Sequence, residues 1–310
     1  MPHPPATLRR LSPVFALLVL CLAGVLVAAA PGPPPSPVVA WARAADWDDF
    51  GVDSDRETVF LDTTDADVPA LAQLLAHGTE PQQIAAKQAL GYGGLNSEAA
   101  IRALLADAGA DHRRYRGMLI AALGQRGSPA DRAHLIRILE EEPLGRDWSA
   151  IMGAGLALGV LRATEAVPAL ERVAGAGDKN AGPYARETLL WLREGPWNVE
   201  ALPGATDEEQ MIRAALRVGL PGSADISMFN DEPRGGVWIF EGHAWRFRAG
   251  GRAADAVHLG FSSRQNAART RAILSAGVSC GMLCGSGYDY VLTREGSGWK
   301  VTGLLHTWVS

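Results

Sequence analysis

A tripeptide, Ala-Leu-Gly, recurs at nearly constant spacing in the middle of this 310-residue chain. Its copies are Ala89–Gly91, Ala122–Gly124 and Ala157–Gly159. The leucines of these copies are 33 and 35 residues apart, and Leu190 follows after a further 32. A period of this length is typical of stacked supersecondary units, because each unit buries its apolar face only against its neighbours. The spacing therefore predicts an array of similar units.

Each unit has the pattern of a helical hairpin whose second helix ends in the tripeptide. The first helices are expected to begin near Val68, Ser97, Ser128 and Val167, and a proline follows three of these residues. Proline suits the first turn of a helix, where its missing N–H is not needed. The glycine of each tripeptide is expected either to end the helix or to let neighbouring hairpins approach closely.

The repeated Ala-Leu-Gly resembles the HEAT family, and within it the short lyase-type repeats of bacteria. The resemblance implies a HEAT/armadillo-like α-solenoid of about four helical hairpins over residues 66–195. HEAT-like arrays mostly bind proteins, and their second helices line a concave face, so the resemblance also implies a protein or peptide partner. One enzyme of the family holds two irons through paired His-Glu dipeptides. No His-Glu dipeptide occurs in this chain, and we expect neither a metal nor a cofactor.

Residues 1–42 have the pattern of a targeting segment. Arg9 and Arg10 precede an unbroken apolar run of 17 residues, Val14–Ala30, and a proline-rich stretch follows. This is the order of regions in a secretory signal peptide. A run of this length is also near the minimum that crosses a bilayer, so an uncleaved N-terminal anchor is the alternative.

Small residues provide three A-x-A-like cleavage sites, at Ala28–Ala30, Ala40–Ala42 and Ala42–Ala44. We therefore expect an exported protein of the periplasm, cell envelope or exterior. Attachment to the membrane through an uncleaved segment is the second choice. Residues 43–65 are then expected to form a capping extension, because the terminal unit of a repeat array needs a polar outer side.

The periodicity changes after a linker at residues 196–206. Residues 207–310 are expected to form a small α+β domain with a mainly antiparallel sheet. One amphipathic helix is predicted over Asp207–Val218, with Thr206 as its N-cap and Glu209 completing a capping box. Strands are predicted at 226–229, 237–241, 256–261, 270–279, 288–294 and 299–308.

Cys280 and Cys284 belong to a Cys-Gly-Met-Leu-Cys-Gly motif that resembles a turn joining two strands near the end of uncharacterised exported bacterial proteins. Beyond the leader they are the only cysteines. Two thiols in an oxidising compartment most simply form a disulfide. A zinc site is the alternative, although His258 and His306 stand at no signature spacing. A redox-active pair more typically has two residues between its cysteines.

The densest basic cluster, Arg113, Arg114, Tyr115 and Arg116, opens the second helix of the second hairpin. Cations at a helix N-terminus oppose the helix dipole, so another use is expected for them. A partner-binding role on the concave face is one interpretation, with an acidic partner or a phosphate as the ligand. The alternative is a solvated helix end.

No motif indicates catalysis. The chain lacks G-x-S-x-G, H-E-x-x-H and G-x-x-x-x-G-K-[ST]. Three glycines between Gly153 and Gly159 superficially resemble a dinucleotide fingerprint, but no strand precedes them, and close helix packing is expected instead.

The charge pattern excludes nucleic acid as a partner. The formal net charge is −5, and no basic stripe is present. We therefore expect a non-catalytic, protein-binding scaffold that binds through its concave solenoid face. A hydrolase or lyase with a site between the two domains is the alternative. His258 or His306 buried beside a carboxylate would favour that alternative.

Overall fold

The structure is a computed structural model, and it describes residues 34–47, 58–93, 113–125, 128–194, 204–219, 236–241, 244–249, 256–281 and 284–309. The first 36 residues form one unit, and residues 37–310 form a second, compact one. The expected signal peptide or anchor, including its apolar run, lies almost wholly outside the described residues. Within those residues, no helix is long and apolar enough to cross a membrane.

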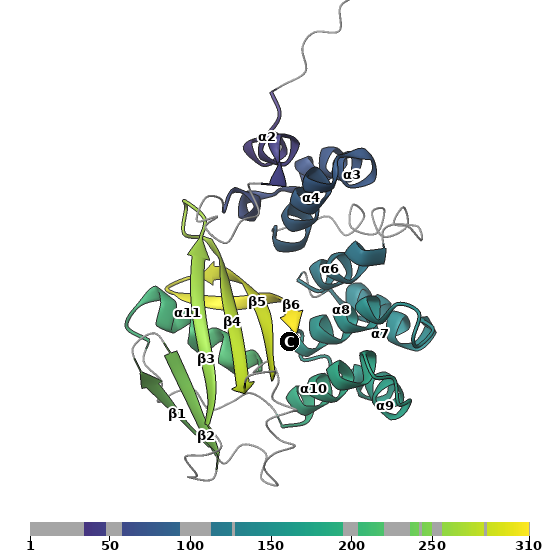
Figure 1. The fold of residues 1–310 in the computed structure, drawn as a ribbon, viewed down its shortest axis with the longest axis vertical. Helices are drawn as coiled ribbons and strands as arrows, with labels where there is room; N and C mark the ends of the chain where they lie inside the picture. The colour runs from purple at the N-terminus through teal and green to yellow at the C-terminus, as the bar shows by residue number, and fades with distance from the viewer. Residues whose placement is uncertain are drawn as a thin grey trace, which may run out of the picture. The chain divides into compact units, whose positions relative to one another are not determined.

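Helices make up most of the N-terminal part of the described chain, and an antiparallel sheet makes up the C-terminal part, as predicted (Figure 1). The starts at Val68, Val167 and Ser128 are confirmed, and Ser128 is the N-cap of its helix. The helix expected from Ser97 lies outside the described residues. The helices of the N-terminal part are α2 (Pro37–Ala44), α3 (Val68–His77), α4 (Glu80–Tyr92), α6 (Arg113–Gly124), α7 (Pro129–Glu141), α8 (Trp148–Val160), α9 (Val167–Gly175) and α10 (Ala181–Glu194).

The glycine of each Ala-Leu-Gly tripeptide lies where one second helix meets the next. A Cβ on Gly91 of α4 would overlap Met118 of α6, and one on Gly124 of α6 would overlap Ala157 of α8. At Gly159 of α8 it would lie 2.7 Å from the buried ring of Trp191 in α10. The expectation of close approach is therefore confirmed, and the same contact recurs along the helical part.

Helix α2 extends the fold towards the N-terminus of the chain. It contacts α3, α4 and the 3-10 helix η2 (Val59–Asp62). Its Val38, Val39 and Ala42 are 2%, 4% and 0% exposed, because they pack in one apolar cluster with residues of these three helices. The expected boundary between leader and capping extension, after residue 42, thus falls inside a packed helix.

The six strands form one antiparallel meander in the order β1 to β6. Strand β2 was missed by the sequence analysis, although Trp245 and Phe247 alternate with two arginines there. The strand expected at 226–229 lies outside the described residues. The strands are β1 (Gly236–Glu241), β2 (Ala244–Ala249), β3 (Ala256–Gln265), β4 (Arg271–Gly281), β5 (Cys284–Glu295) and β6 (Gly298–Val309).

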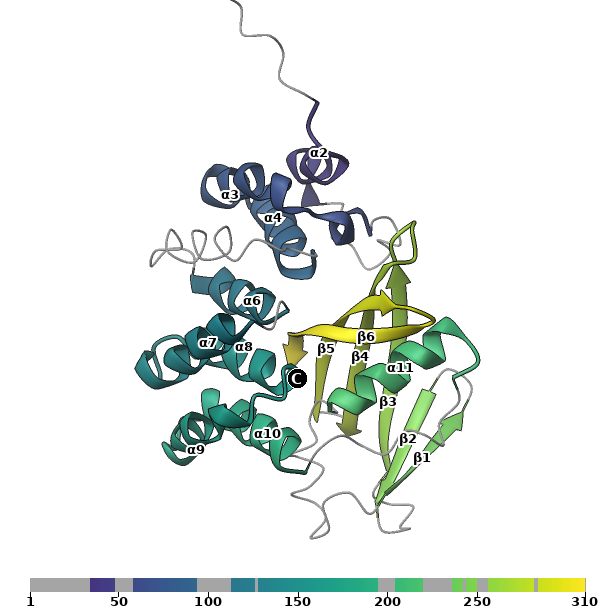
Figure 2. The ribbon, with the colours of Figure 1, turned by 180° about the vertical axis from the view of Figure 1, so that it is seen from behind.

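Both faces of the sheet are buried along its last three strands. Alternate residues point to opposite faces, so neighbours such as Ile273 and Leu274 enter different cores. The face of Leu274 packs under α11 (Asp207–Val218), together with Trp191 of α10 (Figure 2). The face of Ile273 packs with α4, α6 and η2. The capping box of α11, between Thr206 and Glu209, is confirmed.

The helical part also covers the outer edge of the sheet. Helices α6 and α8 contact β6, the last strand, and protect an edge that would otherwise be open to pairing. The side chain of Gln125, directly after α6, packs closely on Gly303 of β6 and donates a hydrogen bond of 2.7 Å to the carbonyl of Gly91.

Arg162 joins the ends of three helices. It follows α8 in the left-handed region, with φ of 52°. Its guanidinium donates to the carbonyls of Trp191 in α10, Arg217 (2.7 Å) and Val218 (3.0 Å). Glycine would adopt this backbone conformation more easily, but it has no side chain that could donate these hydrogen bonds.

Candidate functional site

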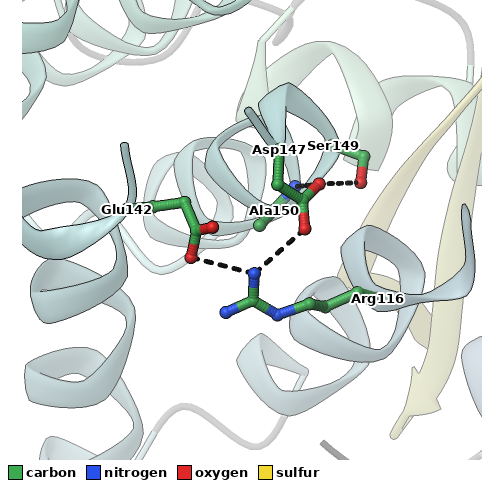
Figure 3. A network of polar contacts seen from close by, with 5 residues as sticks. All are labelled: Arg116, Glu142, Asp147, Ser149 and Ala150. Atoms are coloured by element: carbon green, nitrogen blue, oxygen red, sulfur yellow. Dashed lines mark hydrogen bonds and ion pairs between the residues drawn. The ribbon is translucent and has the colours of Figure 1, made fainter. Parts of the chain in front are cut away.

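Of the four residues in the expected partner-binding cluster, Arg116 has a described side chain, and it is partly buried and paired with two acids of the same chain. Its Nη1 lies 2.8 Å from Oε2 of Glu142 and 2.9 Å from Oδ2 of Asp147 (Figure 3). The side chain is 26% exposed. Arg116 therefore connects α6 to the α7–α8 junction. Arg113, Arg114 and Tyr115 form the first turn of α6, and their side chains lie outside the described residues.

Asp147 is the N-cap of α8, and its second oxygen is also bonded. Oδ1 accepts from the hydroxyl of Ser149 at 2.7 Å and from the backbone N–H of Ala150 at 3.2 Å. Partial burial raises the pKa of Asp147, but the hydrogen bonds from Ser149, Arg116 and Ala150 outweigh it, so the pKa is lowered. The Arg116 pKa is raised in the same way: desolvation lowers it, and bonds to Asp147 and Glu142 prevail. This is the pattern of an ionised structural network.

The two cysteines flank the hairpin between β4 and β5. The register pairs Gly281 with Cys284, and it shifts between Ser279 and Gly281, around Cys280. The motif thus joins two antiparallel strands, as the resemblance implied. The side chains of both cysteines lie outside the described residues, so their pairing stays a prediction. In the part of the chain that the structure describes, no group of three or more His, Cys, Asp or Glu side chains could hold a metal ion.

Of the two histidines singled out in the sequence, His306 has a described side chain, and the structure brings it next to other chemical groups. It lies in β6 directly opposite Tyr288 of β5, and the two ring centroids are 5.0 Å apart, edge to face. Tyr184 of α10 approaches it from the helical part, with ring centroids 5.4 Å apart and Oη 3.5 Å from Nε2. His258 lies in β3, with its side chain outside the described residues.

A buried acid and an exposed ring complete this group. The Tyr288 hydroxyl donates to Oε2 of Glu187 at 3.4 Å, and Glu187 is only 4% exposed. On the other side Trp148 stacks on Tyr184, with centroids 6.3 Å apart and planes at 9°. Trp148 is 40% exposed, whereas most large apolar residues of the described chain are buried. We refer to Trp148, Tyr184, Glu187, Tyr288 and His306 as the His306 cluster.

The phenols of the His306 cluster are held in their protonated form. Burial raises the pKa of Tyr184 to about 12, and the charge of Glu187 adds to the effect. Burial also raises the pKa of Tyr288 well above its usual value, again helped by Glu187. At neutral pH both hydroxyls are therefore hydrogen-bond donors and not bases.

A second buried acid, Asp289, joins the sheet to the helical part. It is 6% exposed and accepts a hydrogen bond of 2.6 Å at each oxygen, from the Tyr92 hydroxyl of α4 and the Ser275 hydroxyl of β4. Beside it, Arg271 of β4 donates to the carbonyl of Tyr92 at 2.7 Å. Both oxygens of Asp289 accept hydrogen bonds from side chains of the fold, which favours a structural role for this carboxylate.

Sequence reasoning named His306 and missed the rest of the His306 cluster. Tyr184 and His306 are separated by 122 residues in the chain. Single tyrosines and tryptophans in separate elements carry no spacing signal, because only packing of the helical part on the sheet brings them together.

Comparisons with protein-family models, with characterised proteins and with solved structures found no match for this chain.

Proposed function

We propose that the protein is a non-catalytic, protein-binding scaffold of the cell envelope or exterior, built on a short HEAT-like α-solenoid. The recurring contact of Gly91, Gly124 and Gly159 with the next second helix supports the solenoid assignment. A fixed helix-to-helix contact repeated along the chain is what stacked hairpins require. The targeting pattern of the N-terminal residues supports export.

The binding surface that we propose lies at the exposed end of the His306 cluster. The second helices α6 and α8, expected to line a concave binding face, contact strand β6 of the same chain. The observation that carries the proposal is Trp148, a 40% exposed tryptophan already stacked on Tyr184. Tryptophan and tyrosine are the residues that most often dominate binding energy at protein interfaces, because they offer large rigid surfaces with a polar end.

The chemistry of the cluster favours a cationic side chain from the partner. The faces of aromatic rings carry partial negative charge and attract Lys or Arg. Glu187, a buried acid that accepts a hydrogen bond from Tyr288, adds negative potential. The formal net charge of −5 also favours a basic partner at long range. We infer a peptide or protein segment that presents Lys or Arg to Trp148.

Trp47 provides a matched control for the experiment, because it is the other exposed large apolar residue of the described chain, at 60%. A photo-crosslinking residue is introduced at position 148 or at position 47, and adducts are recovered from cells that carry the protein. We expect a specific adduct at 148 only. Equal labelling at both positions, or a partner that is held as well by Trp148→Ala as by the native protein, would contradict the proposal.

Binding experiments with purified protein test whether a cationic side chain is recognised, whichever partner carries it. Calorimetry measures the binding of the Lys- and Arg-containing peptides obtained from the adduct, and of versions in which Glu replaces the cations. The native protein and Trp47→Ala should bind the basic peptides, Trp148→Ala should lose at least tenfold in affinity, and the Glu versions should not bind. Equal binding of both peptide kinds would rule out recognition of a cation.

A second candidate function is a hydrolase or lyase centred on His306. The observation that favours it is the chain of contacts from His306 to Tyr288 and from Tyr288 to the buried carboxylate of Glu187. A histidine near an acid can act as a general base. Activity on a panel of esters and amides that is lost in His306→Gln and retained in Trp148→Ala would support this candidate. Equal activity of the native protein and His306→Gln would remove it.

The disulfide between Cys280 and Cys284 also remains a proposal. The register shift at this hairpin supports it, because the strands depart from regular pairing beside Cys280. Intact mass after alkylation with and without prior reduction decides the question. We expect no alkylation before reduction and two added groups afterwards, whereas free thiols in the protein recovered from its own compartment would contradict the proposal.

A further inference from the structure

Two of the three cleavage sites found in the sequence lie in helix α2. Ala40–Ala42 is inside the helix, and Ala42–Ala44 ends it. Cleavage after either site would remove Val38 and Val39, which are 2% and 4% exposed. A leader peptide normally leaves the mature domain intact.

The residues that pack against α2 would become exposed to solvent. The Trp41 ring lies 5.6 Å from that of Phe60, centroid to centroid, and Phe60 in turn lies 5.6 Å from Tyr92. The backbone carbonyl of Arg43 accepts a hydrogen bond of 2.7 Å from the side-chain amide of Gln82 in α4. Removing α2 would therefore expose an apolar face of η2, α3 and α4 at the start of the helical part, where a repeat array needs a closed, polar end.

We propose that the precursor is cleaved within Ala28–Ala30 and that α2 stays in the mature protein as the first helix of its fold. The inference rests on the export proposed above. The step is hydrolysis by a signal peptidase: water adds across one peptide bond, the leader leaves with a new carboxyl terminus, and the mature chain gains a new amino terminus. The proline-rich stretch then precedes α2 as a short N-terminal extension.

The amino terminus of the full-length gene product, purified from the exported fraction of its own cells, tests the inference by mass spectrometry. An amino terminus between residues 29 and 31 supports it. An amino terminus at residue 43 or 45, or an exported chain that keeps its leader, overturns the inference while leaving export intact. A chain found only in the cytoplasm overturns both.

Matched variants show which site is used. Large side chains at the small positions of a cleavage site block processing, so a variant with Ala28→Leu, Ala29→Leu and Ala30→Leu should leave the precursor uncut. Ala40→Leu with Ala44→Leu changes both downstream sites at positions that are exposed in the fold, and its processing should match that of the native chain. The opposite result, in which only the second variant blocks processing, would overturn the inference.

A folding measurement supplies evidence that does not depend on the peptidase. A chain that begins at Pro31 is compared with one that begins at Ala45. Because the shorter chain lacks the buried residues of α2, we expect its melting temperature to fall by roughly 5–10 °C and its binding of an apolar dye to rise. Equal melting temperatures would show that α2 is dispensable and would remove the physical basis of the inference.

Discussion

Tyr92→Phe tests how the helical part is joined to the sheet. The substitution removes one hydroxyl and keeps the ring, which packs against Phe60. That hydroxyl donates a 2.6 Å hydrogen bond to Asp289, a carboxylate with 6% exposure. The remaining described donor to this carboxylate is the Ser275 hydroxyl, on the other oxygen. The variant therefore leaves a buried, charged oxygen without this donor.

The expected cost follows from the charge of the acceptor. A hydrogen bond to a charged group contributes about 1.5–3 kcal/mol, against about 0.5–1.5 kcal/mol for a neutral one. For domains of 150–250 residues, each kcal/mol lowers the melting temperature by about 2–4 °C. Tyr92→Phe should thus lower the free energy of unfolding by about 2 kcal/mol and the melting temperature by roughly 4–8 °C.

Tyr290→Phe is the matched control, because it removes an equally buried hydroxyl whose acceptor is neutral, the carbonyl of Gly219 at 2.7 Å. Urea unfolding is followed by circular dichroism for the helices and by tryptophan fluorescence. A cost for Tyr92→Phe no larger than that for Tyr290→Phe would refute the reasoning from charge. Because Tyr92 and Ser275 share one carboxylate, their double variant should also deviate from additivity by more than about 0.5 kcal/mol.

Four further predictions follow from contacts described above. Arg162→Ala should be less stable than Arg162→Gly by about 1 kcal/mol in urea unfolding, because both lose the guanidinium while only glycine tolerates the positive φ without strain. Asp147→Asn should lower the urea midpoint at pH 7, and its difference from the native protein should shrink as the pH falls below about 4, because a lowered folded-state pKa contributes stability only above the unfolded value. For Tyr184, whose folded-state pKa is raised to about 12, the sign is opposite, because the stability that its protonated hydroxyl contributes should be complete below pH 10 and decline above it. The melting temperatures of the native protein and Tyr184→Phe should therefore converge between pH 10 and 12. Gly153→Ala should destabilise by about 1–3 kcal/mol, since the new Cβ would overlap the carbonyl of Gly117 across the α6–α8 contact, and unchanged stability would contradict the close approach.

The helices were predictable because their signals are local. Proline in the first turn and a capping residue each act within one or two turns of chain. The start at Ser128 and the capping box from Thr206 to Glu209 follow from such signals. Strand β2 had a usable signal, the alternation around Trp245 and Phe247, and was missed.

Helix α2 was not predicted from the sequence, for a different reason. Its small residues, Ala40, Ala42 and Ala44, are equally suited to a peptidase site and to a tightly packed helix. The sequence cannot separate these two uses, because burial of Val38 and Val39 depends on η2, α3 and α4 being in position. The tertiary contact decides that residues before 43 belong to the fold.

The sequence by itself determined the period of the helical part, the change to strands after the helix Asp207–Val218 and the hairpin at Cys280 and Cys284. These features depend on neighbours in the chain. Only the tertiary structure decided that Arg116 is held by Glu142 and Asp147, and that Trp148, Tyr184 and His306 share one cluster. The physical reason is that such groups come from separate elements, and their contacts exist only after the apolar faces of helices and sheet have packed together.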